Sequence, residues 1–231
     1  MQLYTQTHSF NADNYTPVGL YLSYRNRFRY PCLLESNDAN DRTASKSFIG
    51  LDPLIDIRVL QTGIQIREAG KNELIPIENP RKITGQIQEI LDRYTFRNET
   101  EHNGFLSYFS FEFSHFEEGI VTPENQSALP LARFTLFRYL VILDHFHDRG
   151  SILYNSFEPA VKSDSEFREL LRFNQASDLP FELTGEEKTS VSETDFISLV
   201  HQAKMHIHRG DVFQLVVSRP FEQAFFGDDF Q

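Results

Sequence analysis

Hydrophobic residues alternate with polar ones over residues 47–78, which predicts strands that bury one face. Isoleucine and valine recur at every second position over 55–59, a Thr-Gly turn follows, and the alternation resumes over 64–66. A second turn at 70–72 precedes another apolar stretch. This segment therefore reads as an antiparallel meander.

Three segments carry apolar residues at helical spacing. They cover about 80–94, then 165–173, and then a segment that begins at Ser192 or Thr194. Gly210 stands where the third helix needs a residue with a left-handed backbone, so we expect that helix to end there.

Further strands are expected outside the meander. Residues 104–113 form a dense aromatic strand, and the apolar segment 136–143 is followed by 151–157 as its hairpin partner. The apolar segment 212–218 reads as a buried strand. The predicted fold class is α+β, with mostly antiparallel sheets and flanking helices.

The domain organisation follows from a change in composition. Residues 161–191 are acidic and polar, which indicates a linker between a domain at 1–160 and a second unit at 192–231. One helix and one strand cannot bury their own apolar faces. Either this unit packs onto the preceding sheet, or it is the start of a truncated domain. We expect the second, and we expect the exposed core to favour self-association.

Charge and cysteine content narrow the possible partners. The formal net charge is −11 over 231 residues, which argues against nucleic acid and against an anionic membrane surface. The single cysteine, Cys32, excludes an internal disulfide and fits a reducing compartment. The start of the chain shows no basic, apolar signal sequence, so a cytoplasmic location is expected.

Four segments, in order, resemble the large subunit of anthranilate synthase. They are LLES at 33–36, SFIGLDP at 47–53, an aromatic segment at 103–118 and AKMHIHRGDVFQLVVSRPF at 203–221. The last resembles the opening of the chorismate-binding domain in the chorismate-utilising enzymes. The resemblance implies the fold of the N-terminal half of that subunit, with 192–231 as the start of the chorismate-binding domain.

The resemblance also implies a reaction and its partners. The complete subunit would bind chorismate and Mg²⁺, take ammonia from a glutamine amidotransferase subunit, and release pyruvate to give anthranilate. The catalytic histidine and the acidic Mg²⁺ ligands of the family are expected beyond Gln231. The chain is therefore expected to hold no catalytic residue and no metal ligand of its own, and to be inactive alone.

Gln214 narrows the branch of the family and is a candidate for lining the active site. Isochorismate and salicylate synthases carry a lysine general base at the similar position, and a glutamine cannot take a proton from water. Ammonia is then the better nucleophile, which leaves anthranilate and aminodeoxychorismate synthases.

The LLES segment resembles the site at which anthranilate synthase binds tryptophan as a feedback inhibitor. Glu35 has the charge to pair with the ammonium group of a free amino acid, and Ser36 can form a hydrogen bond with its polar end. Leu34, or its neighbour Leu33, would pack against the indole ring. Because side chains alternate along a strand, a bend or strand end is needed for Glu35 and Ser36 to serve one ligand.

Other interpretations remain open at this point. The enzyme alternative is the large subunit of aminodeoxychorismate synthase, and the alternative from another class is a non-catalytic ligand-binding or interaction module. Residues 33–36 also fit a plain strand-to-loop junction. The acidic and histidine residues at 144–148 are expected at an exposed hairpin end more than in a metal site.

Overall fold

The computed structural model of the protein describes residues 1–35, 45–98, 100–118, 129–172 and 180–230. The chain forms two compact units, Met1–Ala176 and Ser177–Gln231. The boundary lies inside 161–191, the segment predicted as a linker. That segment also contains a helix of the first unit and a strand of the second.

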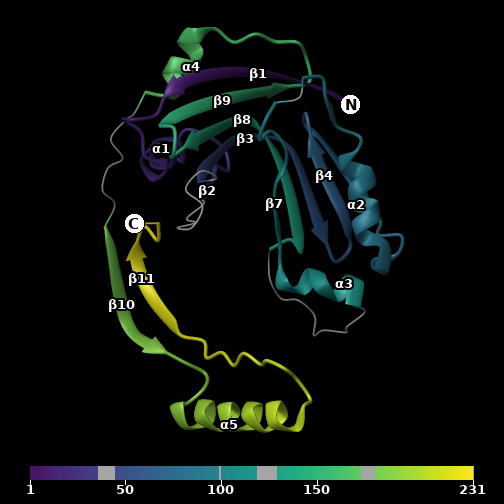
Figure 1. Ribbon diagram of the computed structural model, residues 1–231, viewed down its shortest axis with the longest axis vertical. Coiled ribbons are helices and arrows are strands. Elements are labelled where there is room, and N and C mark those ends of the chain that lie inside the picture. The colour runs from purple at the N-terminus through teal and green to yellow at the C-terminus, as the bar shows by residue number, and fades with distance from the viewer. Residues whose placement is uncertain (36–44, 99, 119–128, 173–179, 231) are drawn as a thin grey trace. The chain divides into compact units, whose positions relative to one another are not determined.

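The first unit is built on one nine-stranded sheet, most of which is antiparallel (Figure 1). Its main path runs β5-β4-β3-β8-β9-β1-β6, while β2 pairs with β3 and β7 pairs with β8. Among the strands of the described residues, only the two-residue β6 pairs in parallel, with β1. The strands are β1 (Gln2–Asn11), β2 (Cys32–Glu35), β3 (Lys46–Leu60), β4 (Gly63–Glu68), β5 (Lys71–Ile75), β6 (Thr95–Phe96), β7 (Leu106–Phe109), β8 (Ala132–Asp144) and β9 (Arg149–Ser156).

A bulge in the middle of β3 organises the sheet. Pro53 lies opposite Phe137 of β8 and Ile55 lies opposite Leu136, so β3 holds one extra residue there. Proline lacks the N–H that a central strand needs, and a bulge is one of the few places in a sheet that accept it. Asp52, just before it, has a left-handed φ of 55°.

The bulge moves the apolar residues of β3 from one face of the sheet to the other. Before it, Ile49 and Leu51 lie on the face that we call the first face; beyond it, Ile55 and Ile57 lie on the opposite, second face. The regular alternation of the sequence gives no sign of this change.

Helices cover both faces. On the first face, α1 (Pro17–Tyr24) buries Tyr24 in the cluster that holds Ile49 and Leu51 of β3. α4 (Asp164–Leu170) buries Phe167 in the same cluster, where its ring stacks on His8 of β1. On the second face, α2 (Ile83–Leu91) buries one side against the later half of β3 and against β4. The predicted helix at 80–94 is shorter than expected, because residues 80–82 form the 3₁₀ turn η2 (Pro80–Lys82).

The aromatic segment 104–113 is only partly a strand. It forms β7 over Leu106–Phe109 and then turns into η3 (Phe111–Phe113) and α3 (Ser114–Glu118). The prediction of one continuous strand is wrong, because the chain leaves the β8 ladder after Phe109. The predicted hairpin is confirmed as β8 and β9.

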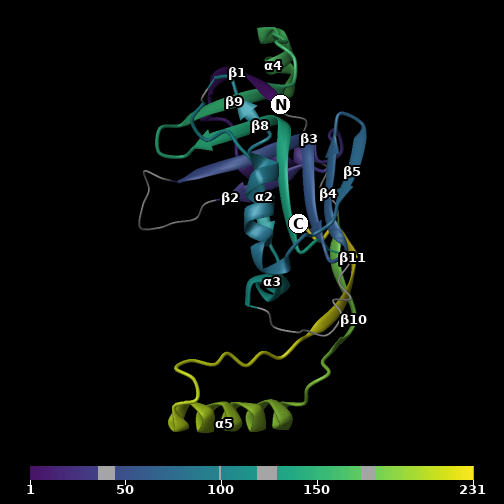
Figure 2. The same cartoon turned by 90° about the vertical axis from the view of Figure 1, so that its right-hand side faces the viewer.

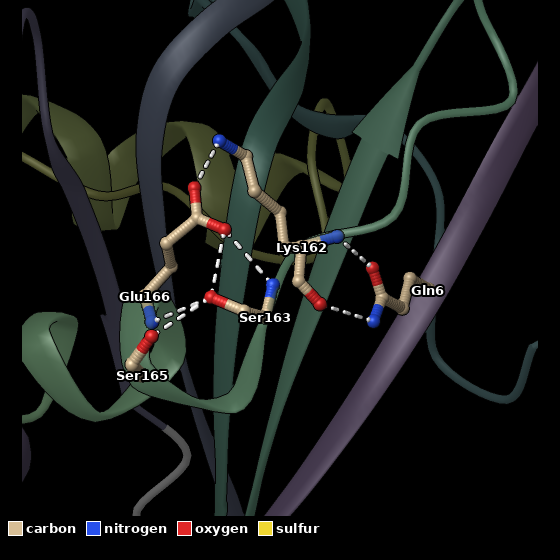
Figure 3. Close-up of polar contacts among 5 residues, drawn as sticks. All are labelled: Gln6, Lys162, Ser163, Ser165 and Glu166. Atoms are coloured by element: carbon tan, nitrogen blue, oxygen red, sulfur yellow. Dashed lines mark hydrogen bonds and ion pairs between the residues drawn. The ribbon is translucent and has the colours of Figure 1, made fainter.

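The start of α4 is fixed to the sheet by polar contacts (Figure 3). The side-chain amide of Gln6 on β1 donates to the Lys162 carbonyl at 2.9 Å and accepts from the Lys162 N–H at 2.7 Å. Ser163 and Glu166 form a capping box, and Lys162 Nζ donates to Glu166 at 2.7 Å. The hydrogen bonds from Lys162, which contributes most, and from Ser163 lower the pKa of Glu166 to about 2.

In the described part of the second unit, residues 180–230, there is one helix and one two-stranded ribbon. The helix α5 (Glu193–Arg209) begins after its cap Ser192 and ends at Gly210, whose φ is 79°, so the prediction for this helix is confirmed. β10 (Phe181–Lys188) and β11 (Glu222–Gly227) pair antiparallel.

The predicted buried strand at 212–218 is wrong. These residues form no strand in the structure, and five of the seven, Gln214 among them, are exposed. A strand needs a neighbour that accepts its backbone hydrogen bonds, and β10 and β11 pair only with each other. Within the described ranges, no helix is both long and apolar enough to cross a bilayer.

The fold class is thus confirmed as α+β with mostly antiparallel strands and flanking helices.

Candidate functional site

β2 places most of the LLES segment at the edge of the sheet. Residues Leu33, Leu34 and Glu35 lie opposite 47–49 of β3, which belong to SFIGLDP. Leu33 packs into the core of the first face, whereas Leu34 is 43% exposed and Glu35 is exposed as well. β2 is described over Cys32–Glu35. Ser36 lies outside the described residues.

An apolar row leads from Leu34 across the second face. Leu34 lies opposite Phe48 on β3, and Phe48 lies opposite Ile142 on β8. Ile142 packs with Leu140 and Leu153, and the Phe48 ring rests on this cluster. Cross-strand neighbours of this kind hold a sheet together, and here they also give the exposed Leu34 a continuous apolar floor.

This floor continues into a cavity of about 930 Å³. The volume lies in the range of small-molecule sites. Phe10, Ile142 and Leu153 are its large apolar residues, while Lys46 of β3, strands β1, β8 and β9 and residues 100–102 supply a polar rim. His102 and Asp148 on this rim have left-handed φ angles of 63° and 51°. The ionisable rim residues are Asp13, Lys46, Glu101, His102, Asp144, His147, Asp148 and Arg149.

Charges on the rim are held in place. Lys46 Nζ lies 3.3 Å from Asp144 Oδ2, and the backbone N–H of His147 donates to Asp144 Oδ1 at 3.0 Å. Burial alone would raise the pKa of Asp144, but the hydrogen bonds of His147 and the Lys46 charge outweigh it and bring the pKa to about 2. Asp144 is therefore ionised at neutral pH and fixes the Lys46 ammonium at the cavity.

The two histidines near this hairpin have separate partners. Ser47 is 1% exposed, and its Oγ lies 2.7 Å from Nε2 of His145. His147 Nδ1 lies 3.1 Å from Asp144 Oδ1. Among the residues that the structure describes, no group of three or more His, Cys, Asp or Glu side chains is placed to hold a metal ion.

Gly50 explains why SFIGLDP needs a glycine. A Cβ atom at this position would lie 2.3 Å from the ring of Phe137 on the neighbouring strand. Such a contact is far inside van der Waals distance, so the Phe137 ring and the backbone of β3 can share this space only without a side chain.

Sequence reasoning found part of this site and missed part. It named Leu34 and Glu35, which lie at the edge of the apolar row. It passed over Lys46 and treated Asp144 and His147 as ordinary hairpin residues, although Lys46 directly precedes SFIGLDP. Gln214 lies in the second unit, is exposed, and lines none of the described cavities, so its active-site role stays a prediction for a longer chain.

Comparison with known proteins agrees with this picture. A sequence model of the family described as chorismate binding enzyme matches residues 55–231. Anthranilate synthase component 1 of Acetivibrio thermocellus is 26% identical over 229 residues, covering 90% of this chain and 46% of that protein. The protein of the same name from Methanothermobacter thermautotrophicus is 26% identical over 214 residues, with coverage of 92% and 43%.

A solved structure supports the fold. Anthranilate synthase component I from Streptococcus pneumoniae aligns with a TM-score of 0.57 at 19% identity, covering 95% of this chain and 49% of that one. The chain spans about half the length of the curated relatives that it matches. Since the family match takes in most of the sequence, the chain belongs to the family of chorismate-binding enzymes.

Proposed function

We propose that this chain is the feedback-regulatory, N-terminal portion of an anthranilate synthase large subunit. The observation that carries the proposal is the exposed Leu34 at the end of an apolar row that opens into a cavity with a charged rim. An aromatic amino acid has matching chemistry, because it joins a large apolar ring to one ammonium and one carboxylate group.

The proposed ligand is free tryptophan. Its indole ring would pack on Leu34, and Glu35 and Ser36 at the strand end would meet its polar groups. Because side chains alternate along a strand, this proposal requires a bend or strand end that lets Glu35 and Ser36 serve one ligand. The Lys46 ammonium on the cavity rim is a further candidate for the carboxylate.

In the complete protein we propose the reaction of anthranilate synthase, in which chorismate and ammonia give anthranilate and pyruvate. Two points support this choice over other chorismate enzymes: the resemblance places Gln214 where water-using relatives have a lysine, and the compared relatives carry the name anthranilate synthase. The partner would be a glutamine amidotransferase subunit, and Mg²⁺ would be held by residues outside this chain.

The regulatory site is tested in a protein of the relatives' length that carries this sequence. Leu34→Lys, or Ser36→Phe, is expected to weaken inhibition of anthranilate formation by tryptophan at least tenfold, because a buried charge or a bulky ring displaces the indole. Leu74→Lys is the matched control, since Leu74 is also an exposed leucine on an edge strand. Unchanged inhibition in both site variants would refute the assignment.

The chain alone provides a second test. It contains no tryptophan residue, so tryptophan fluorescence would report only the ligand. We expect weak or no binding, and no anthranilate from chorismate and ammonia. Turnover by the purified chain would overturn the view that the catalytic groups lie outside it.

The same longer protein separates the alternatives. Release of aminodeoxychorismate instead of anthranilate would identify the folate-pathway enzyme. No turnover of chorismate under any nitrogen source would favour a non-catalytic ligand-binding module.

A further inference from the structure

A second cavity, of about 310 Å³, lies on the opposite face of the sheet from the tryptophan-site candidate. It is formed by β3 just beyond the bulge, the hairpin of β4 and β5, and residues 29–30 after α1. These three strands lie side by side (Figure 2). Because the bulge sends the isoleucines of β3 to the second face, the polar residues Asp56 and Arg58 form the floor here.

Every carboxylate that lines this cavity already has a partner. Asp56 Oδ1 accepts from Arg133 Nε at 2.6 Å, and its Oδ2 accepts from Arg58 Nε at 2.8 Å. Burial would raise the pKa of Asp56, but these two guanidinium groups outweigh it and lower the pKa below its usual value. Asp56 therefore stays ionised, and its negative charge is paired with Arg58 and Arg133.

The two remaining carboxylates are engaged in the same way. Asp52 Oδ2 accepts from Arg138 Nε at 2.8 Å, and Glu68 accepts a hydrogen bond from the Tyr94 hydroxyl. The acidic side chains of the cavity are thus directed to groups around it, and little negative charge is left to face its interior.

Three cations on the cavity wall have no such partner. Arg29, Arg67 and Lys71 line the cavity, are exposed, and form no ion pair with any carboxylate in the described part of the chain. Arg67 lies directly opposite Asp56 in the β3–β4 register, and Lys71 begins β5 across the turn from Glu68. In a chain with a net charge of −11, this is a local concentration of unneutralised positive charge.

The backbone around this cavity also departs from ordinary geometry. Five non-glycine residues in the described ranges have left-handed φ angles, and Tyr30, Asp52 and Ala69 among them line this cavity. Such conformations persist where the surrounding structure enforces them, and they concentrate at ligand sites. Here they set the rim from which Arg29, Arg67 and Lys71 project.

We propose that this cavity binds a small dianion, a phosphate or a dicarboxylate, through Arg29, Arg67 and Lys71. The two arginines provide forked donors that match phosphate or carboxylate oxygens, and Lys71 adds a point charge. The site is separate from the tryptophan-site candidate and does not rest on it. Its volume of about 310 Å³ suits a small ligand.

The test is calorimetric titration of the whole chain with inorganic phosphate and, separately, with succinate, at constant ionic strength. Constant ionic strength matters because salt screens exposed charges. Saturable binding of at least one of the two is expected, and the preferred probe identifies the chemical class. A signal that fails to saturate with either probe would overturn the proposal.

Variants locate the site. Arg67→Gln/Lys71→Gln should weaken binding by about tenfold or more, since each lost cation removes a charge-assisted hydrogen bond. The matched control is Arg81→Gln/Lys82→Gln, which removes the same two charge types from exposed positions on η2 outside the cavity. Binding that falls equally in both pairs would reflect net charge alone and would refute the site.

A third variant tests whether the segment after α1 and the β4–β5 hairpin contribute cations to the same anion site. Arg29→Gln removes the cation contributed by the segment after α1, far in sequence from the β4–β5 hairpin. It should weaken binding of the same probe by several-fold, while the thermal unfolding midpoint stays that of the wild type. An unchanged affinity would show that the hairpin alone attracts the anion and that the cavity is not the site.

Discussion

The two units of this chain use the same kinds of sequence pattern with opposite results. In the first unit, alternating strands and amphipathic helices bury two large clusters against a shared sheet. In the second, α5 has an apolar stripe of the same type, yet Ala203 is its one buried residue. Hydrophobic patterning states which face of an element is to be covered, and only a neighbouring element can cover it.

The largest expected difference in stability between the two units comes from removing a single isoleucine side chain in each. Ile57→Ala, at a fully buried site in the first unit, should lower the free energy of unfolding by about 2–5 kcal/mol. Ile197→Ala, at a side chain that is 50% exposed on α5, should change it by less than about 0.5 kcal/mol. Urea unfolding followed by circular dichroism measures both, and equal effects would mean that α5 packs in solution.

Acid should act on the first unit through Asp144. Its pKa is about 2 in the folded state, below its ordinary value of 3.8, so its contribution is present above pH 4 and is lost as pH falls toward 2. The shift corresponds to roughly 2 kcal/mol. The wild type should lose more stability than Asp144→Asn between pH 4 and pH 2, as measured by thermal unfolding. Parallel pH profiles would contradict this.

Helix caps sharpen the comparison further. Ser163→Ala removes the cap of α4, which is packed on the core, and should cost about 1 kcal/mol of global stability. Ser192→Ala removes the cap of α5, whose side chain accepts from Asp195 N–H at 3.1 Å. It should speed hydrogen exchange at the start of α5 and leave unfolding of the first unit unchanged. A global effect of Ser192→Ala would show that the two units unfold together.

The smallest effect concerns the turn between β4 and β5. Ala69 and Gly70 have φ angles of 44° and 79°, a pair that two-residue hairpins favour but that alanine adopts at a cost. Ala69→Gly should raise the free energy of unfolding by about 0.5 kcal/mol, whereas Gly70→Ala should lower it by about 1 kcal/mol. Thermal unfolding of the pair measures both, and the same sign for both would contradict the turn geometry.

The sequence predicts where the helices and strands of this fold lie better than it predicts which elements pack against each other. The β8–β9 hairpin and the end of α5 at Gly210 follow from local signals, so they are confirmed. The error at 212–218 has a different cause, because an apolar run states a preference for burial and contains no information about whether a partner strand exists. The sequence pattern could not predict the two cavities for the same reason, because each cavity depends on which strands lie side by side.

Within the candidate site, Leu34 and Glu35 were recognised because they belong to a short motif of adjacent residues. Lys46 and Asp144 are 98 residues apart in sequence and meet only through the β3–β8 register. The charged cavity on the opposite face could not be predicted for a related reason. The sequence Ile-Asp-Ile-Arg at 55–58 indicates one buried face, but the bulge decides which face of the sheet each residue takes.

The bulge at Pro53 also means that a change in the length of β3 disturbs the fold more than a change in its composition. Related chains can exchange one aliphatic residue for another along β3 with little effect. Loss of a single residue between Leu51 and Ile55 would instead turn every later side chain over, placing isoleucines among the arginines and Asp56 in the hydrocarbon interior. The number of residues from Gly50 to Ile57 therefore determines which face each later side chain takes. We expect no insertions or deletions there in any homologue that packs helices on both faces of this sheet.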